Sequence, residues 1–198
     1  MSGRSARWAV ALLLVPALAA CSGGGREPAP GPATAASSAP AAKFSGFATP
    51  CPTVDGRTGS KLPSSLDTPI SLTVHCAYGD RTKFPHVHSV SAINKAGNPK
   101  GAPDQITEEM FGALRDKART DAADGVSAAE RQGLGDEAFV VVSYKDNITV
   151  MVVRSANALI QASLTVDAQG DRAAELAALR AQEPAVTELA RALLAQLR

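Results

Sequence analysis

The three histidines of this chain could bind a metal ion. They are His75, His86 and His88, and all lie in one segment that we expect to form a β-hairpin. Residues two apart on a strand project from the same face, so His86 and His88 share a face. A loop centred near residues 81–82 would set His75 opposite His88 and bring the three imidazoles together. Three neutral imidazoles can bind zinc and leave a fourth position open. The alternative is that the three histidines are exposed on the surface of a sheet.

Cys51 and Cys76 are a second set of side chains that could do chemistry. Neither belongs to a C-x-x-C pair, which disfavours a zinc site built from cysteines. In an oxidising compartment two such cysteines form a disulfide, and we expect that bond here. Two buried free thiols are the alternative.

The chain lacks the common catalytic motifs: it has no Gly-x-Ser-x-Gly, Ser-x-x-Lys or His-Glu-x-x-His and no phosphate-binding glycine loop. Its acidic pairs, Glu108-Glu109 and Asp136-Glu137, have no evident partner for acid–base catalysis. We expect the first pair at a helix start, where carboxylates favour the positive end of the dipole. We expect Asp136 to bond backbone amides in a turn. The sequence therefore predicts neither catalytic residues nor a cofactor.

Cys21 stands where apolar sequence gives way to glycine. Arg4 and Arg7 precede an apolar run over residues 8–18, which is too short for a hydrocarbon core that needs about 20 residues. A basic start followed by an apolar run of this length is typical of a secretory signal peptide.

The residues Leu18-Ala19-Ala20-Cys21 resemble the bacterial lipobox. This resemblance implies that residues 1–20 are removed as a lipoprotein signal peptide and that the Cys21 sulfur receives a diacylglyceryl group. Two acyl chains anchor a protein stably where one does not. We therefore expect a lipid-anchored protein on the extracytoplasmic face of the cell membrane, with palmitate-type chains on Cys21. Ordinary secretion with a free cysteine is the alternative.

Residues 21–43 contain mainly Gly, Pro, Ala and Ser, a composition that cannot bury enough surface to offset the entropy of ordering. We expect a disordered tether that reaches up to roughly 60 Å. Loss of residues 1–20 removes Arg4 and Arg7, so the 20 lysines and arginines fall to 18 against 19 acidic residues and the net charge becomes −1. Such a balance argues against a nucleic-acid partner.

Residues 44–198 have the size of one domain. Alternating apolar and polar residues predict a half-buried strand at 70–78, with Cys76 facing inward, and a return strand at 86–93. Turn residues separate three further strands that should form a meander, at 139–144, 148–154 and 159–166. In the last of these, Ile160, Ala162, Leu164 and Val166 should face inward, opposite Gln161, Ser163 and Thr165.

Two helical regions complete the predicted domain. Asp104 can cap a helix that runs to about Ala123, with Ile106, Met110, Leu114 and Ala118 on its buried side. A second helical region starts near Asp171 and is interrupted at Pro184, with Val186, Leu189, Leu193 and Leu197 in one apolar stripe. Separate runs of strands and helices indicate an α+β fold: an antiparallel sheet of about five strands, packed against helices on one face.

Several short motifs together resemble a known family. These are the lipobox, the tether, a strand ending Cys76-Ala77-Tyr78, the sequence GLGDEA at 133–138 and VRSAN at 153–157. The ensemble resembles actinobacterial lipoproteins that share a domain of unknown function, some of which are similar to extracellular sensor-like domains of mycobacterial kinases. The family carries no established catalytic residues, so the resemblance transfers none to this chain.

The sequence therefore predicts a lipid-anchored domain that binds or senses a small molecule, a lipid or another envelope protein. The alternative function is metal binding, or a metal-dependent activity, at His75, His86 and His88.

Overall fold

The computed structural model describes residues 42–80, 83–167 and 171–198, and leaves the side chains of residues 123 and 124 undescribed. The predicted signal peptide at 1–20, the predicted lipidation site Cys21 and the predicted tether up to residue 41 lie outside the described residues. So does the predicted loop centre at residues 81–82.

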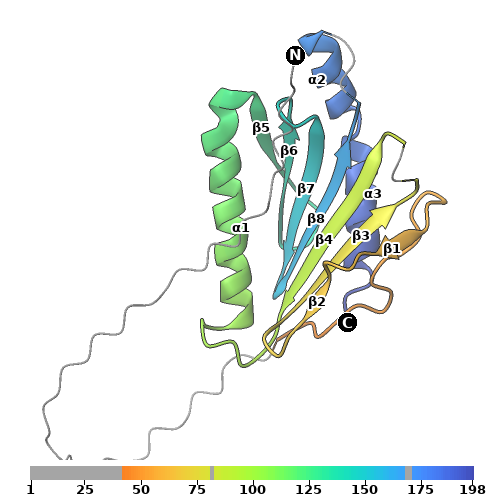
Figure 1. Cartoon of the computed structure of the whole chain (residues 1–198). Helices are drawn as coiled ribbons and strands as arrows, with labels where there is room; N and C mark the ends of the chain where they lie inside the picture. Colours follow the sequence, from red (N-terminus) through yellow and green to blue (C-terminus); the bar gives the residue numbers. More distant parts are fainter. Residues whose placement is uncertain (1–41, 81–82, 168–170) are drawn as a thin grey trace, which may run out of the picture. The chain divides into compact units, whose positions relative to one another are not determined.

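One antiparallel sheet of eight strands forms the centre of the described domain (Figure 1). The strand order is β1-β3-β4-β8-β7-β6-β5, and β2 pairs with β3 beside β1. The strands are β1 (Gly59–Lys61), β2 (Leu66–Asp67), β3 (Ser71–Tyr78), β4 (His86–Asn94), β5 (Val126–Arg131), β6 (Glu137–Ser143), β7 (Ile148–Ser155) and β8 (Ala158–Thr165). The α+β class is thus confirmed, as is the meander of β6, β7 and β8.

The five predicted strands are present to within two residues at each end, but the sheet has three more. The extra strands are β1, β2 and β5. The sequence of β5, Val-Ser-Ala-Ala-Glu-Arg, is poor in the branched and aromatic residues that favour strands. It becomes a strand because it pairs with β6 along its whole length, from Val126 opposite Ser143 to Arg131 opposite Ala138.

Helices cover both faces of the sheet, so the expectation of one covered face is wrong. The helical elements are α1 (Pro103–Thr120), a 3₁₀ turn (Asp121–Asp124), α2 (Arg172–Arg180) and α3 (Glu183–Leu194). α1 packs on one face against Phe139, Val152 and Leu159. α3 packs on the opposite face, where Val140, Met151 and Ile160 belong to the larger core. The central strands carry apolar residues on both faces, and a sheet of that kind must be covered twice.

The caps and faces of the helices correct two further expectations. α1 begins at Pro103 rather than after Asp104, and no side chain caps it; proline suits the first helical position because that N–H has no helical partner. Phe111 is the buried anchor of α1, whereas Met110 is 39% exposed. By contrast, α2 begins next to Asp171 as predicted, and Asp171 caps it, with its Oδ1 accepting from two backbone amides.

The predicted disulfide between Cys51 and Cys76 is present, with the two Cα atoms 5.8 Å apart. Cys76 lies on β3 and is only 1% exposed, so it faces the core as the alternation predicted. Val186, Leu189 and Leu193 of α3 are also buried, while Leu197 pairs with Phe47 in an isolated bridge. In the part of the chain described here, no helix is both long and apolar enough to span a bilayer.

Candidate functional site

The face of the sheet that carries α1 is covered over only part of its width (Figure 1). The apolar contacts of α1 lie mainly on β6, β7 and the start of β8. Towards β3 the same face is partly exposed, and we call this surface the open half-face. Its residues are Thr73, His75 and Ala77 of β3, His86, His88, Val90 and Ala92 of β4, and Gln161, Ser163 and Thr165 of β8.

The rows of paired residues across the sheet show why α1 stops where it does. One row runs from His88 through Ser163 to Val150 and Val141. A neighbouring row runs from His75 through Val90 and Gln161 to Val152 and Phe139. In both rows the β8 residue is polar and the β7 and β6 residues are apolar, and α1 covers the apolar part, because buried polar groups without partners are costly. Seven of the ten residues of the open half-face therefore have polar side chains, and the other three are Ala77, Val90 and Ala92.

All three histidines lie on the open half-face, which confirms that they share a face. The predicted register is wrong, however: His75 pairs with Val90, and His88 pairs with Ala77. The β3–β4 connection places the centre of the hairpin one residue later than expected, which moves His75 diagonally away from His88. The ring centroids of His86 and His88 are 6.4 Å apart. Among the described residues no group of three His, Cys, Asp or Glu side chains could hold a metal ion, so the three-histidine zinc site is not formed.

Exposed apolar side chains border the open half-face. Phe84 is 49% exposed and stacks on His86, with ring centroids 4.2 Å apart. Leu66 of β2 is 59% exposed and pairs with Thr73, which places it on the same face. Along the described parts of β3, β4 and β8 this face presents no Asp or Glu side chain, and its titratable groups are the three histidines.

A small hollow lies on the opposite face, where the ends of β3 and β4 that carry Tyr78 and Val87 meet α3. Its volume is about 20 Å³, room for roughly one water molecule. Tyr78 lines it, and burial raises the pKa of this phenol above that of a free tyrosine, although a contact of 3.4 Å with the Ser89 hydroxyl acts in the other direction. The remaining lining residues are Val54, Asp55, Arg57, Val87, Leu164, Ala185, Val186 and Leu189. This hollow is too small to hold an organic ligand.

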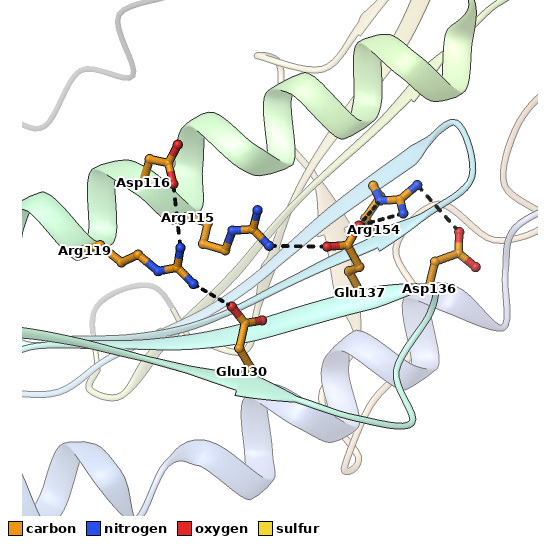
Figure 2. A network of polar contacts seen from close by, with 7 residues as sticks. All are labelled: Arg115, Asp116, Arg119, Glu130, Asp136, Glu137 and Arg154. Carbon is orange, nitrogen blue, oxygen red and sulfur yellow. Dashed lines mark hydrogen bonds and ion pairs between the residues drawn. The ribbon is translucent and has the colours of Figure 1, made fainter.

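The acidic pair Asp136-Glu137 is structural (Figure 2). Asp136 Oδ2 accepts from the Ala156 backbone amide at 2.6 Å, which confirms the predicted bonding of this turn. Glu137 is directly opposite Arg154 in the register and accepts two hydrogen bonds from its guanidinium, at 2.7 and 3.0 Å. Both carboxylates thus hold the β5–β6 turn against the end of β7.

Two arginines of α1 extend this network to the helix (Figure 2). Arg115 reaches Glu137 Oε2 at 3.4 Å, and Arg119 reaches Glu130 of β5 at 3.2 Å. Sequence reasoning missed these contacts. The arginines lie on the flank of the helix, and nothing local indicates which strand they meet. The network is a clamp between α1 and the sheet, and it offers no group for acid–base catalysis.

Comparison of the chain with protein-family models, with curated proteins and with solved structures finds no match.

Proposed function

We propose that this chain is a lipid-anchored extracytoplasmic protein whose domain binds another envelope protein without catalysing a reaction. Cys21 is the proposed lipidation site, and residues 21–43 are the proposed tether between the membrane and the domain. The proposed contact surface is the open half-face.

The disulfide supports the extracytoplasmic location. Disulfides of this kind persist in oxidising compartments and are rare in the cytosol. Cys76 is buried in the larger core, and its partner Cys51 comes soon after the start of the domain. The bond therefore belongs to the folded structure rather than to an exposed, exchangeable pair of thiols.

The open half-face is the observation that carries the binding role. Most of its side chains are polar, and exposed Phe84 and Leu66 border it. Exposed apolar side chains beside polar ones suit a macromolecular partner, since small ligands bind mostly in concave pockets. Histidine can donate hydrogen bonds to carboxylates, and this surface carries no carboxylate of its own on the described strands. The partner that fits it best is a protein segment that presents Asp or Glu side chains.

The anchor is tested by the mass of the mature protein. Purified from its own cell envelope, the protein should begin at Cys21 and carry the extra mass of a diacylglyceryl group. Cys21→Ala should abolish acylation, whereas the neighbouring Ser22→Ala variant should retain it. An acylated Cys21→Ala protein, or a parent without acyl mass, contradicts the proposed anchor.

The contact surface is tested by site-specific crosslinking in intact cells. A photo-crosslinking residue at Gln161, on the open half-face, should capture one partner, and the same residue at Ala177, exposed on α2, should not. The captured protein is then purified and its affinity measured directly. Ser163→Arg should weaken binding at least tenfold, while Ala177→Arg leaves it unchanged. Equal affinities for the two variants would show that the partner binds elsewhere.

A further inference from the structure

The two edges of the sheet differ in how well they are protected. On one side, β3 is covered by β1 and β2, which have three and two residues. Pro63 lies between them. Very short strands and proline are devices that prevent an edge from pairing with another chain. On the other side, β5 is a continuous strand of six residues without proline, and it pairs only with β6 in the described sheet.

The register shows which backbone groups of β5 point away from the sheet. The Tyr144 amide donates to the Gly125 carbonyl at 3.2 Å, so this is a hydrogen-bonded pair. Hydrogen-bonded and non-hydrogen-bonded pairs alternate along antiparallel strands. The N–H and C=O groups of Val126, Ala128 and Glu130 therefore point outward. They form a regular template that a further strand can use.

The side chains at the middle of β5 are small and uncharged, so they would not block another strand. Ser127, Ala128 and Ala129 are small and exposed. The two charged residues at the end of the strand are turned towards helices on opposite faces. Glu130 forms an ion pair with Arg119 of α1. Arg131 forms a bidentate ion pair with Glu183 of α3, with two hydrogen bonds. No charge projects from the centre of the strand to repel a partner.

We propose that β5 pairs with β5 of a second copy of this chain, antiparallel and about a two-fold axis at Ala128. This register places Ala128 opposite its own copy and Val126 opposite Glu130 of the other chain. Ser127 then meets Ala129. No like charges face each other, and the smallest side chains lie at the centre. A two-fold contact of this kind closes on itself and joins the two sheets into one.

The outward groups of the two strands match in this register. They can form about six backbone hydrogen bonds across the axis. The Glu130 carbonyl also accepts from Arg131 Nη1 at 2.8 Å, but a carbonyl oxygen has a second lone pair for the partner strand. The open half-face lies towards the β3 side of the sheet, far along the strand order from β5. The two surfaces are thus separate, and this inference is independent of the proposed function.

Sedimentation equilibrium of the full chain in a mild detergent tests the contact, at protein concentrations up to about 1 mM. We expect a monomer–dimer equilibrium. Ala128→Lys should abolish the dimer, because it sets two ammonium groups opposite each other. Ser60→Lys, on the protected β1 edge, is the matched control and should leave the dimer intact. A chain that stays monomeric throughout, or a dimer that persists in Ala128→Lys, overturns the proposal.

Amide hydrogen exchange identifies the strand directly. At a concentration where the dimer dominates, the Ala128 amide should exchange at least tenfold more slowly than in dilute protein. The amides of Ser127 and Ala129 already donate to β6, so their protection should change much less. A dimer that leaves the exchange of Ala128 unchanged uses another surface, and that result also overturns the proposal.

Discussion

Substitution of Gly135 tests the packing of the β5–β6 turn more sharply than any other single change. A Cβ atom at this position would lie 2.3 Å from the Arg154 carbonyl oxygen and 2.8 Å from Val153 Cγ1. The first of these atoms belongs to the backbone of β7, so it cannot rotate away. Gly135 also has a φ of +58°, which L residues rarely adopt. Gly135→Ala therefore forces the turn away from β7 and weakens the adjacent contacts of Asp136.

Gly133 is the matched control for this substitution, because its φ is +77° and nothing lies within 4 Å of its added Cβ. Left-handed backbone strain costs roughly 1–2 kcal/mol in both variants. The reduced entropy of the unfolded chain offsets about 0.4–1 kcal/mol of it in both. Only Gly135→Ala adds steric overlap, which costs about 1–3 kcal/mol. The difference between the two variants isolates the overlap and should be about 2 kcal/mol.

Urea unfolding followed by circular dichroism measures this difference. With a slope of about 2 kcal/mol per molar urea, Gly135→Ala should unfold about 1 M earlier than Gly133→Ala. If the two midpoints agree within about 0.2 M, the close approach of Gly135 to β7 is not what stabilises the turn, and the reasoning fails.

Three further outcomes follow from the fold. Replacing both Cys51 and Cys76 by alanine should lower the free energy of unfolding by about 3.5 kcal/mol in the chain-entropy account, since the bond spans 25 positions; reduction of the parent should give the same loss in urea titrations. Asn157→Ala removes three hydrogen bonds that tie the start of the domain to β4 and the β7–β8 turn. The free energy of unfolding, measured by thermal denaturation, should fall by about 2–4 kcal/mol. An unchanged midpoint would contradict the role of these bonds. Hydrogen bonding to Arg131 lowers the pKa of Glu183. A carboxyl group whose pKa is lowered by folding stabilises the folded state above its pKa in the unfolded chain, near 4.3, and this stabilisation is lost as the pH falls through its pKa in the folded state. Glu183→Gln should therefore flatten the acid limb of the stability curve by up to about 1 kcal/mol, and an identical acid limb would refute the linkage.

Several parts of the candidate site were predictable from local patterns. The alternation in β3 and β4 places His75, His86 and His88 on one face in any register that keeps the same parity, and the structure confirms it. The exact pairing of β3 with β4 was not predictable, because it depends on which residues form the turn between the two strands. A shift of one residue in the hairpin centre kept the face but separated the side chains that a zinc site needs.

Other parts of the site had no local signal. The open half-face exists because the apolar contacts of α1 lie mainly on β6, β7 and the start of β8, and α1 meets β4 at its end, where Asn94 donates to Thr107. No helix pattern states which strands a helix will cross. The contacts of Arg115 and Arg119 with Glu137 and Glu130 depend on the same crossing. The anchor at Cys21 stays a prediction, since it lies outside the described residues.

The amino-acid sequence by itself determined the strands of the meander, the inward face of Cys76 and the break between α2 and α3, because periodicity, capping and proline act over a few residues. Tertiary structure decided the rest. It placed α1 and α3 on opposite faces, since strands that are apolar on both faces, such as Val150–Val153, require cover on each. It also made a strand of β5, whose own residues disfavour that conformation. Pairing with β6 supplies what local propensity lacks, and the same pairing leaves the outer edge of β5 available to a partner.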